Sequence, residues 1–168
     1  MIDEVDRIVE AWHRERPDLD VMPLTILSRV TRLARHLDGA RRGAFARHRL
    51  EVWEFDVLSA LRRAGEPYQL SPGTLVSQTL VTSGTMTNRI DRLVAHGLVE
   101  RLPAPGDRRG VLVRLTPSGR EHVDAAMEDL LAVEHELLAD LSASEQTALA
   151  DLLRVLVAPF DASAGQDT

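Results

Sequence analysis

The sequence predicts a mainly α-helical protein with one small β-hairpin, and three observations support this fold class. Apolar residues recur every three or four positions over most of the 168 residues, which is the spacing of amphipathic helices. Two short β-prone runs, 98–102 and 111–115, are separated by a charged segment rich in proline and glycine. Long apolar helical segments flank this pair of runs on both sides. A chain of this length is expected to form a single domain around one core.

Three helices are expected before residue 67. The first covers residues 2–16, with Trp12 on its apolar stripe, and ends at Pro17. The second runs from Pro23 to about Arg47 and has a continuous apolar stripe. The third covers residues 51–64 and stops at Gly65.

Two shorter helices joined by a tight turn follow a very short extended segment around residues 67–70. Ser71 and Pro72 form an N-cap and N1 pair for a helix to about Thr79. Thr82 caps a helix over residues 83–96, which Gly97 closes. The pattern predicts a helix-turn-helix, and the hairpin that follows makes residues 67–116 a winged helix-turn-helix.

The last part of the chain is expected to be helical. Thr116 and Pro117 start a long helix to about Leu141, and a capping box of Ser142 and Glu145 starts a final helix that ends near Pro159. Residues 161–168 have the composition of a disordered tail.

Residues 23–66 and 117–160 form an all-helical scaffold around the winged helix, and residues 1–16 add an N-terminal helix. Their apolar stripes pack either within one chain, as an intramolecular bundle, or between two chains. The dimer is the favoured interpretation, because a small winged helix cannot cover so much apolar helix alone.

Composition excludes several classes of function. The chain has no cysteine, so disulfides and thiolate metal sites are absent. It has no signal peptide and no apolar run long enough to span a membrane, which implies a cytoplasmic protein. No nucleophile lies beside a base, and the six histidines are scattered. We therefore expect no enzyme activity, no cofactor and no metal site.

Charge is unevenly distributed along the chain. Residues 83–120 carry a net charge of +4, although the whole chain carries −6. A basic segment of this kind favours a nucleic-acid partner, although a solvated surface can have the same charge.

The helix over residues 83–96 separates into two faces. Met86, Ile90, Leu93 and Val94 form the apolar arc that packs on the preceding helices. The polar residues are suited to contacts in a major groove of double-stranded DNA, and we predict that they bind it: Ser83, Thr85, Thr87, Asn88 and Arg92. Arg89 lies closer to the apolar arc than Arg92 does, so it is expected to lean toward the protein.

The hairpin tip adds three further predicted DNA-binding residues, Asp107, Arg108 and Arg109. The arginines can reach a minor groove or phosphates from this protruding element. Asp107 would repel phosphate, so it is expected to hold an arginine such as Arg109 in place.

These residues carry a resemblance to a known family. The stretch "DRRGVLVRLT" from Asp107 resembles the wing signature of MarR-family transcriptional regulators, and "SGTMTNRIDRLVAHGLVER" resembles their recognition helix. The resemblance covers about residues 23–159. It implies a homodimeric winged-helix regulator, usually a repressor, that binds a pseudo-palindromic operator and is released by a small ligand.

A narrower resemblance concerns the ligand. An N-terminal helix that carries a tryptophan is similar to the urate-responsive subgroup of this family, and Trp12, Asp56, Arg89 and Arg101 match the positions of its pocket residues. The resemblance implies a small anionic effector such as urate, another purine or a carboxylate. The alternative is that Asp56 and Arg89 form a structural ion pair and that Trp12 belongs to the core.

The sequence is therefore compatible with two hypotheses of function. The first is a ligand-responsive, DNA-binding regulator. The alternative is a winged-helix protein-interaction module without small-molecule sensing.

Overall fold

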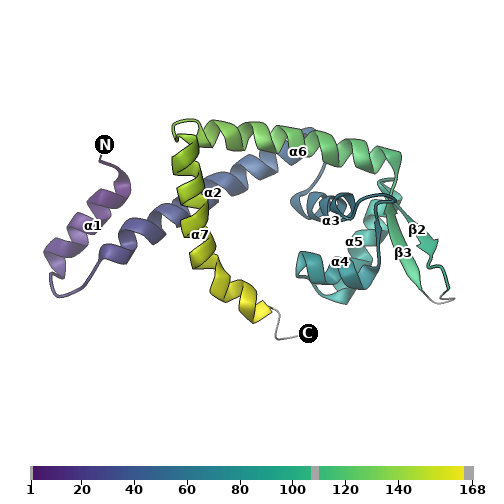
Figure 1. Ribbon diagram of the computed structural model, residues 1–168, viewed down its shortest axis with the longest axis horizontal. Helices are drawn as coiled ribbons and strands as arrows, with labels where there is room; N and C mark the ends of the chain where they lie inside the picture. The colour runs from purple at the N-terminus through teal and green to yellow at the C-terminus, as the bar shows by residue number, and fades with distance from the viewer. Residues whose placement is uncertain (1, 107–109, 165–168) are drawn as a thin grey trace. The chain divides into compact units, whose positions relative to one another are not determined.

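The helices and strands follow one another in the predicted order over residues 2–106 and 110–164, which are the residues that this computed structural model describes. Figure 1 shows them along the chain. The elements are α1 (Glu4–Glu15), α2 (Met22–Arg47), α3 (Val52–Arg63), β1 (Gln69–Leu70), α4 (Pro72–Thr79), α5 (Ser83–Ala95), β2 (Val99–Pro103), β3 (Val111–Leu115), α6 (Pro117–Leu138) and α7 (Ala143–Ala164). The predicted fold class, mainly α-helical with a small β wing, is confirmed.

The chain divides into two compact units, residues 1–130 and 131–168. The first unit contains α1 to α5, the sheet and most of α6. The second contains the end of α6 and α7. One domain for the whole chain, with residues 67–116 as its winged part, stays a prediction.

The helix starts are built as the sequence predicts. The hydroxyl of Ser71 accepts the Thr74 N–H at 3.1 Å at the start of α4, and Thr82 does the same for the Thr85 N–H at 3.3 Å at the start of α5. The carboxylate of Glu145 accepts the Ser142 N–H at 2.8 Å before α7. Each contact satisfies an N–H group at a helix start, where backbone partners are missing.

The end of α5 is a Schellman turn. Gly97 has φ of +71°, and its N–H donates to the Val94 carbonyl at 2.9 Å, while the Leu98 N–H donates to the Leu93 carbonyl at 3.0 Å. Glycine is favoured at this left-handed position. The turn sends the chain directly from α5 into β2.

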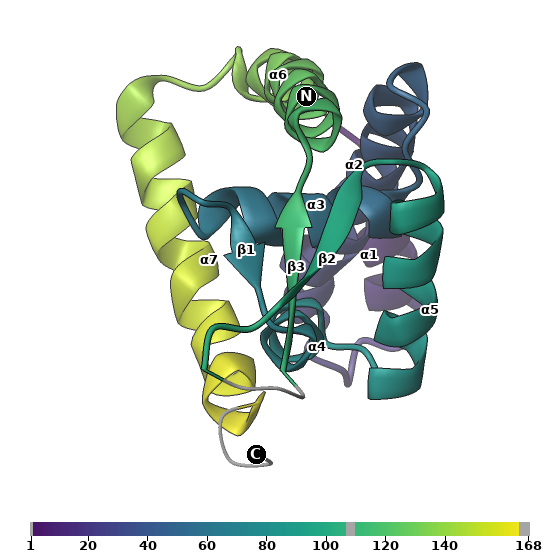
Figure 2. The same ribbon diagram turned by 90° about the vertical axis from the view of Figure 1, so that its right-hand side faces the viewer.

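The small sheet has three strands, one more than the predicted hairpin. β3 lies between β1 and β2 and is antiparallel to both, as Figure 2 shows. The segment expected to be merely extended, Gln69–Leu70, pairs with Arg114 and Val113. The wing is therefore attached to the segment that precedes α4.

The core of the first unit brings the winged part and the scaffold together. Phe45 of α2 stacks on Phe55 of α3, with ring centroids 4.0 Å apart. Leu75 of α4, Met86 of α5 and Val113 of β3 are completely buried in the same cluster. Each such side chain contributes about 1.5–3 kcal/mol on burial, so this cluster determines where α5 lies.

Two helix ends differ from the prediction. α6 ends at Leu138, three residues before the predicted Leu141, and α7 continues through Pro159 to Ala164. The prediction that the last helix stops near Pro159 is wrong, because a proline removes one helical N–H and strains one turn but does not forbid helix on both sides. Of the predicted tail 161–168, residues 161–164 are helical and residues 165–168 lie outside the described residues.

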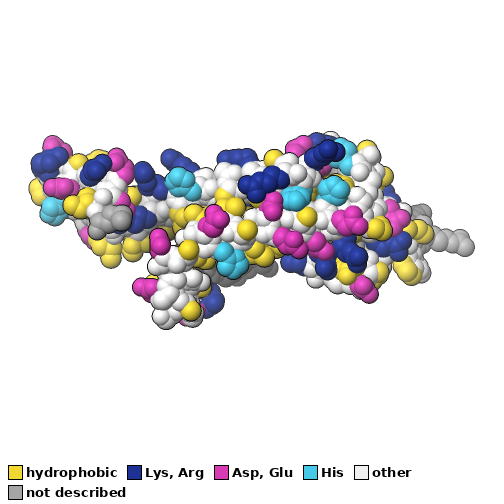
Figure 3. Space-filling view, turned by 90° about the horizontal axis from the view of Figure 1, so that it is seen from above, with side chains coloured by type: hydrophobic (Ala, Val, Ile, Leu, Met, Phe, Trp, Pro, Cys, Tyr) yellow, Lys and Arg dark blue, Asp and Glu magenta, His cyan; other side chains and the backbone are white. Residues whose placement is uncertain are grey.

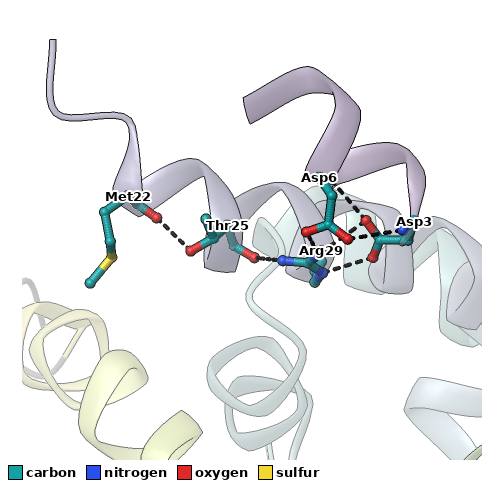
Figure 4. Close-up of polar contacts among 5 residues, drawn as sticks. All are labelled: Asp3, Asp6, Met22, Thr25 and Arg29. Carbon is teal, nitrogen blue, oxygen red and sulfur yellow. Dashed lines mark hydrogen bonds and ion pairs between the residues drawn. The ribbon is translucent and has the colours of Figure 1, made fainter. Parts of the chain in front are cut away.

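α1 is joined to α2 by a cluster of ion pairs, drawn in Figure 4. Arg29 of α2 donates to Asp3 at 2.8 Å and to Asp6 at 2.6 Å. Its guanidinium donates a second bond to Asp3 at 3.0 Å and another to the carbonyl of Thr25 at 2.6 Å. Asp3, Asp6 and Arg29 thus connect α1 to α2 by ion pairs.

Much of the remaining surface is charged. On the face seen in Figure 3, basic and acidic side chains alternate. Ion pairs of the first unit include Arg62 with Asp124 at 2.8 Å. Within the described residues, no helix is long and apolar enough to cross a membrane, and no group of three or more acidic or histidine side chains is arranged to hold a metal ion.

Candidate nucleic-acid interface

α5 presents its polar face to solvent, as its pattern predicts. Met86, Ile90 and Leu93 are buried, and the predicted groove-facing residues are all exposed: Ser83, Thr85, Thr87, Asn88 and Arg92. Val94, expected on the apolar arc, is 38% exposed because it lies at the edge of that arc.

The turn before α5 is tight. Leu80 has φ of +53° and its side chain is 84% exposed. An apolar residue in the left-handed region is uncommon and costs about 1–2 kcal/mol. The strain is confined to the turn that sets α5 against α4.

The hydroxyl groups of α5 also take part in the helix. Thr85 shares a hydrogen bond with the Thr82 hydroxyl at 2.9 Å, and the Thr87 hydroxyl donates to the Ser83 carbonyl at 3.0 Å. A hydroxyl oxygen has two lone pairs, so one hydrogen bond of either direction leaves it at least one lone pair that can accept. Both threonines therefore remain able to accept hydrogen bonds from base amino groups.

Arg92 contacts the start of α3. Its Nη2 donates to Oε1 of Glu51 at 2.8 Å, and its guanidinium lies 4.7 Å from the ring centre of Trp53. The Trp53 indole N–H donates to the other oxygen of Glu51 at 2.7 Å. These contacts lower the pKa of Glu51, the indole hydrogen bond contributing most and Arg92 next.

The same tryptophan lies under a second arginine. The guanidinium of Arg89 is 5.5 Å from the Trp53 ring centre. Trp53, Thr85, Asn88, Arg89 and Arg92 together line a hollow of about 260 Å³ on the surface. The exposed face of α5 is thus a shallow, basic depression with an aromatic floor.

The wing strands carry charge pairs that brace the hairpin. Arg114 of β3 donates to Glu100 of β2 at 2.8 Å, and these residues are opposite one another in the ladder. Arg101 of β2 donates to Asp91 of α5 at 2.6 Å and so connects the wing to that helix. The predicted tip residues Asp107, Arg108 and Arg109, and the expected pairing of Asp107, lie outside the described residues.

The structure brings together two of the four predicted ligand-binding residues. Asp56 and Arg89 line one hollow of about 590 Å³, together with Arg42 and Trp53. Asp56 forms an ion pair with Arg41, at 3.1 Å, rather than with Arg89. Glu51 also lines this hollow, so two carboxylates and two arginines lie around the Trp53 ring.

The other two predicted residues lie apart from this hollow within the single chain. Trp12 is 48% exposed and borders a separate shallow hollow with Ala11 and Glu15. Arg101 is paired with Asp91. Trp12 is thus not a core residue of the first unit.

Sequence reasoning missed the residues that surround these arginines. Two of them, Glu51 and Trp53, lie at the start of α3. The other two, Arg41 and Arg42, lie toward the end of α2. Trp53 and Asp56 are three residues apart, so a helical pattern places them on one face. Nothing in the local pattern indicates that α5 packs across this face.

A helix-turn-helix whose second helix leads into a β wing defines the class of winged helix-turn-helix DNA-binding proteins. Residues 50–110 match the model of the MarR family. The transcriptional regulator PecS of Dickeya dadantii is 38% identical over 150 residues, which cover 89% of this chain and 90% of PecS. The chain belongs to the MarR family of transcriptional regulators.

Other relatives agree with this assignment. The multiple antibiotic resistance protein MarR of Escherichia coli K12 is 38% identical over 102 residues, covering 60% of this chain and 69% of MarR. The solved structure of apo MarR from E. coli superposes with a TM-score of 0.67 at 30% sequence identity. The match covers 83% of this chain and 99% of the MarR chain. A mutant MarR solved with operator DNA gives the same values. These relatives are regulators and not enzymes, as the sequence predicted for this chain.

Proposed function

We propose that the chain is a repressor that binds a pseudo-palindromic operator in double-stranded DNA as a homodimer. The observation that carries the proposal is the exposed polar face of α5, whose opposite face is anchored in the core. Its hydroxyl, amide and guanidinium groups are those that contact base edges and phosphates in a major groove. The operator complex of the E. coli relative supports the same use of this fold. We propose that the protein acts in the cytoplasm, where it would meet chromosomal DNA.

A homodimer follows from the uncovered apolar side chains of the scaffold. On α2, Leu27, Val30 and Leu33 are 54%, 40% and 46% exposed. A monomer rarely leaves such a stripe in water. A symmetric pair of winged helices would contact half-sites about one helical turn apart.

DNA binding is tested by its salt dependence. Duplexes are selected by the wild-type protein from a random-sequence library, and affinity for the enriched duplex is measured at several salt concentrations. If about six phosphates are neutralised, affinity falls by roughly a thousandfold between about 50 and 200 mM salt. A failure to enrich any duplex, or an affinity that does not change with salt, would favour the alternative of a protein-interaction module.

We further propose that a small anionic ligand such as urate, another purine or a carboxylate releases the protein from DNA. The hollow around Asp56 and Arg89 supports an anion site, because Arg42 adds a second guanidinium and Trp53 a flat apolar surface. A planar anion fits such a set by bidentate hydrogen bonds and stacking.

The effector proposal is tested with urate, xanthine and salicylate against the bound enriched duplex. Arg42→Ala is expected to keep DNA affinity within about threefold and to lose release by the active compound, since it removes a guanidinium that lines the hollow. Wild-type protein that stays on DNA with all three compounds would contradict the proposal.

A further inference from the structure

Arg92 is the one charged residue among the groove-facing positions predicted on α5, and its guanidinium is held from outside α5. Glu51 accepts a hydrogen bond from Nη2 at 2.8 Å, and the Trp53 ring centre lies 4.7 Å from the guanidinium carbon. Both contacts come from the first residues of the α3 segment. A long, flexible side chain thus has two attachment points in addition to its own backbone.

Glu51 is itself held in place. One carboxylate oxygen accepts from the Trp53 indole N–H at 2.7 Å and the other from Arg92. Hydrogen bonds with an ionised partner are stronger and more directional than neutral ones. An indole, a carboxylate and a guanidinium therefore form a connected series across the surface between α3 and α5.

The series ends on a rigid support. Trp53 is partly buried and packs against the core cluster, and Val57, Leu58 and Leu61 further along α3 are completely buried. A side chain supported by a close-packed core has little freedom to move. Arg92 is thus oriented by contacts with residues that the core holds in place.

The arrangement leaves Arg92 able to bind. Its side chain is half-exposed, and a guanidinium has five N–H donors, of which Nη2 contributes to the contact with Glu51. The remaining donors can make a bidentate pair with a base edge. Such pairs discriminate between bases only when the guanidinium plane is correctly oriented.

We propose that Glu51 and Trp53 are positioning residues that hold Arg92 in the orientation in which it reads a base edge, and that they thereby determine the sequence preference of DNA binding. The proposal rests on the proposed function of α5 as the recognition helix. In the opposite case, a decoy role, Glu51 would not position Arg92 but would compete with DNA phosphate for its guanidinium and so weaken DNA binding.

The test compares two duplexes, the one enriched by the wild-type protein and a shuffled duplex of the same composition. The measured quantity is a ratio, the dissociation constant for the shuffled duplex divided by that for the enriched duplex. Glu51→Gln keeps an acceptor for the indole but removes the charge that orients Arg92, and Trp53→Phe removes the indole N–H while keeping the charge. We expect Glu51→Gln to lower the ratio about tenfold, the discrimination of one oriented arginine pair, and Trp53→Phe to lower it by a smaller factor.

Arg92→Ala supplies the readout that separates positioning from a general structural effect. In that background Glu51→Gln is expected to change the ratio by less than about twofold, because there is no guanidinium left to orient. Glu4→Gln is the matched control, since Glu4 forms an exposed pair with Arg7 on α1 at 3.3 Å. The thermal midpoint of each variant is measured to confirm that it folds.

Three results would overturn the proposal. The ratio could stay unchanged in Glu51→Gln and Trp53→Phe, or fall equally with and without Arg92, or affinity for both duplexes could rise together, as a decoy requires. If the wild-type protein enriches no duplex, the proposed function fails instead. The two failures are therefore distinguishable.

Discussion

Gly119 shows how one residue determines the junction between the wing and the scaffold. A Cβ atom at this position would lie 2.0 Å from the Leu98 carbonyl oxygen. Thr116 closes the same junction, because its N–H donates to the Leu98 carbonyl at 3.1 Å and its hydroxyl donates to the Gly97 carbonyl at 2.7 Å. The start of α6 thus packs directly on the turn between α5 and β2.

We expect Gly119→Ala to lower the free energy of unfolding by about 1–3 kcal/mol, because the added methyl group forces the two backbones apart. Urea denaturation followed by circular dichroism measures the change. Gly39→Ala is the control: nothing lies within 4 Å of its Cβ position on α2, so alanine there should stabilise by up to about 1 kcal/mol. Equal stability of the two variants would show that the junction tolerates a side chain.

Helix periodicity assigned the two arginines of α5 to the correct faces. Arg89 is half-buried and Arg92 exposed, as their angles from the apolar arc predicted. The partners of these arginines could not be predicted, since Glu51 and Trp53 are about forty residues away in the chain. A helical wheel reports direction from the axis and contains no information on which element lies there.

The attachment of α1 is electrostatic as well as apolar. Arg29 lowers the pKa of Asp3 from 3.8 to about 2, mainly by direct hydrogen bonding. The pKa of Asp6 is lowered too, chiefly by the Asp3 N–H and then by Arg29. Because the folded-state pKa lies below the ordinary one, the stabilisation is present above about pH 4 and is lost as the pH falls toward 2.

We expect the attachment of α1 to α2 to weaken between about pH 4 and pH 2, and in Arg29→Ala to be weaker already at neutral pH. Hydrogen exchange of residues 4–15 measures the detachment, which should exceed any change in α3. Arg7→Ala is the control, since that arginine pairs within α1 with Glu4. Protection of α1 that is the same in Arg29→Ala as in wild type would show that apolar contacts alone hold the helix.

Helix starts were easier to predict than helix ends. Ser71, Thr82 and Ser142 form their expected caps, because a cap is a local contact over three residues. The sequence predicts that the last helix stops near Pro159, yet α7 continues to Ala164. A local rule cannot weigh the cost of one proline against the contacts of the following turn.

Large apolar side chains are exposed in both units of the described chain. In the second unit, Leu152, Val155 and Phe160 of α7 are 66%, 72% and 75% exposed. Exposure of these three side chains agrees with the proposed homodimer. Net charge of −6 leaves operator binding dependent on the local +4 of residues 83–120.

We expect the double variant Leu152→Glu and Val155→Glu to weaken the dimer at least a hundredfold, because it removes two apolar side chains worth about 1.5 kcal/mol or more each. Sedimentation velocity at several concentrations measures the assembly. Ser144→Glu places a charge on the first turn of the same helix and should leave the dimer intact. Wild-type protein that sediments as a monomer would contradict the homodimer.

The order of the elements, the faces of α5 and the family could be predicted from the sequence alone, because periodicity, caps and the wing motif are short-range properties. Tertiary structure decided which side chains meet: β1 joined the wing as a third strand, Asp56 paired with Arg41, and Arg92 came to Glu51 and Trp53. These contacts depend on how one buried core packs the helices and the sheet together. Packing is a property of the assembled side chains, and no local pattern contains it.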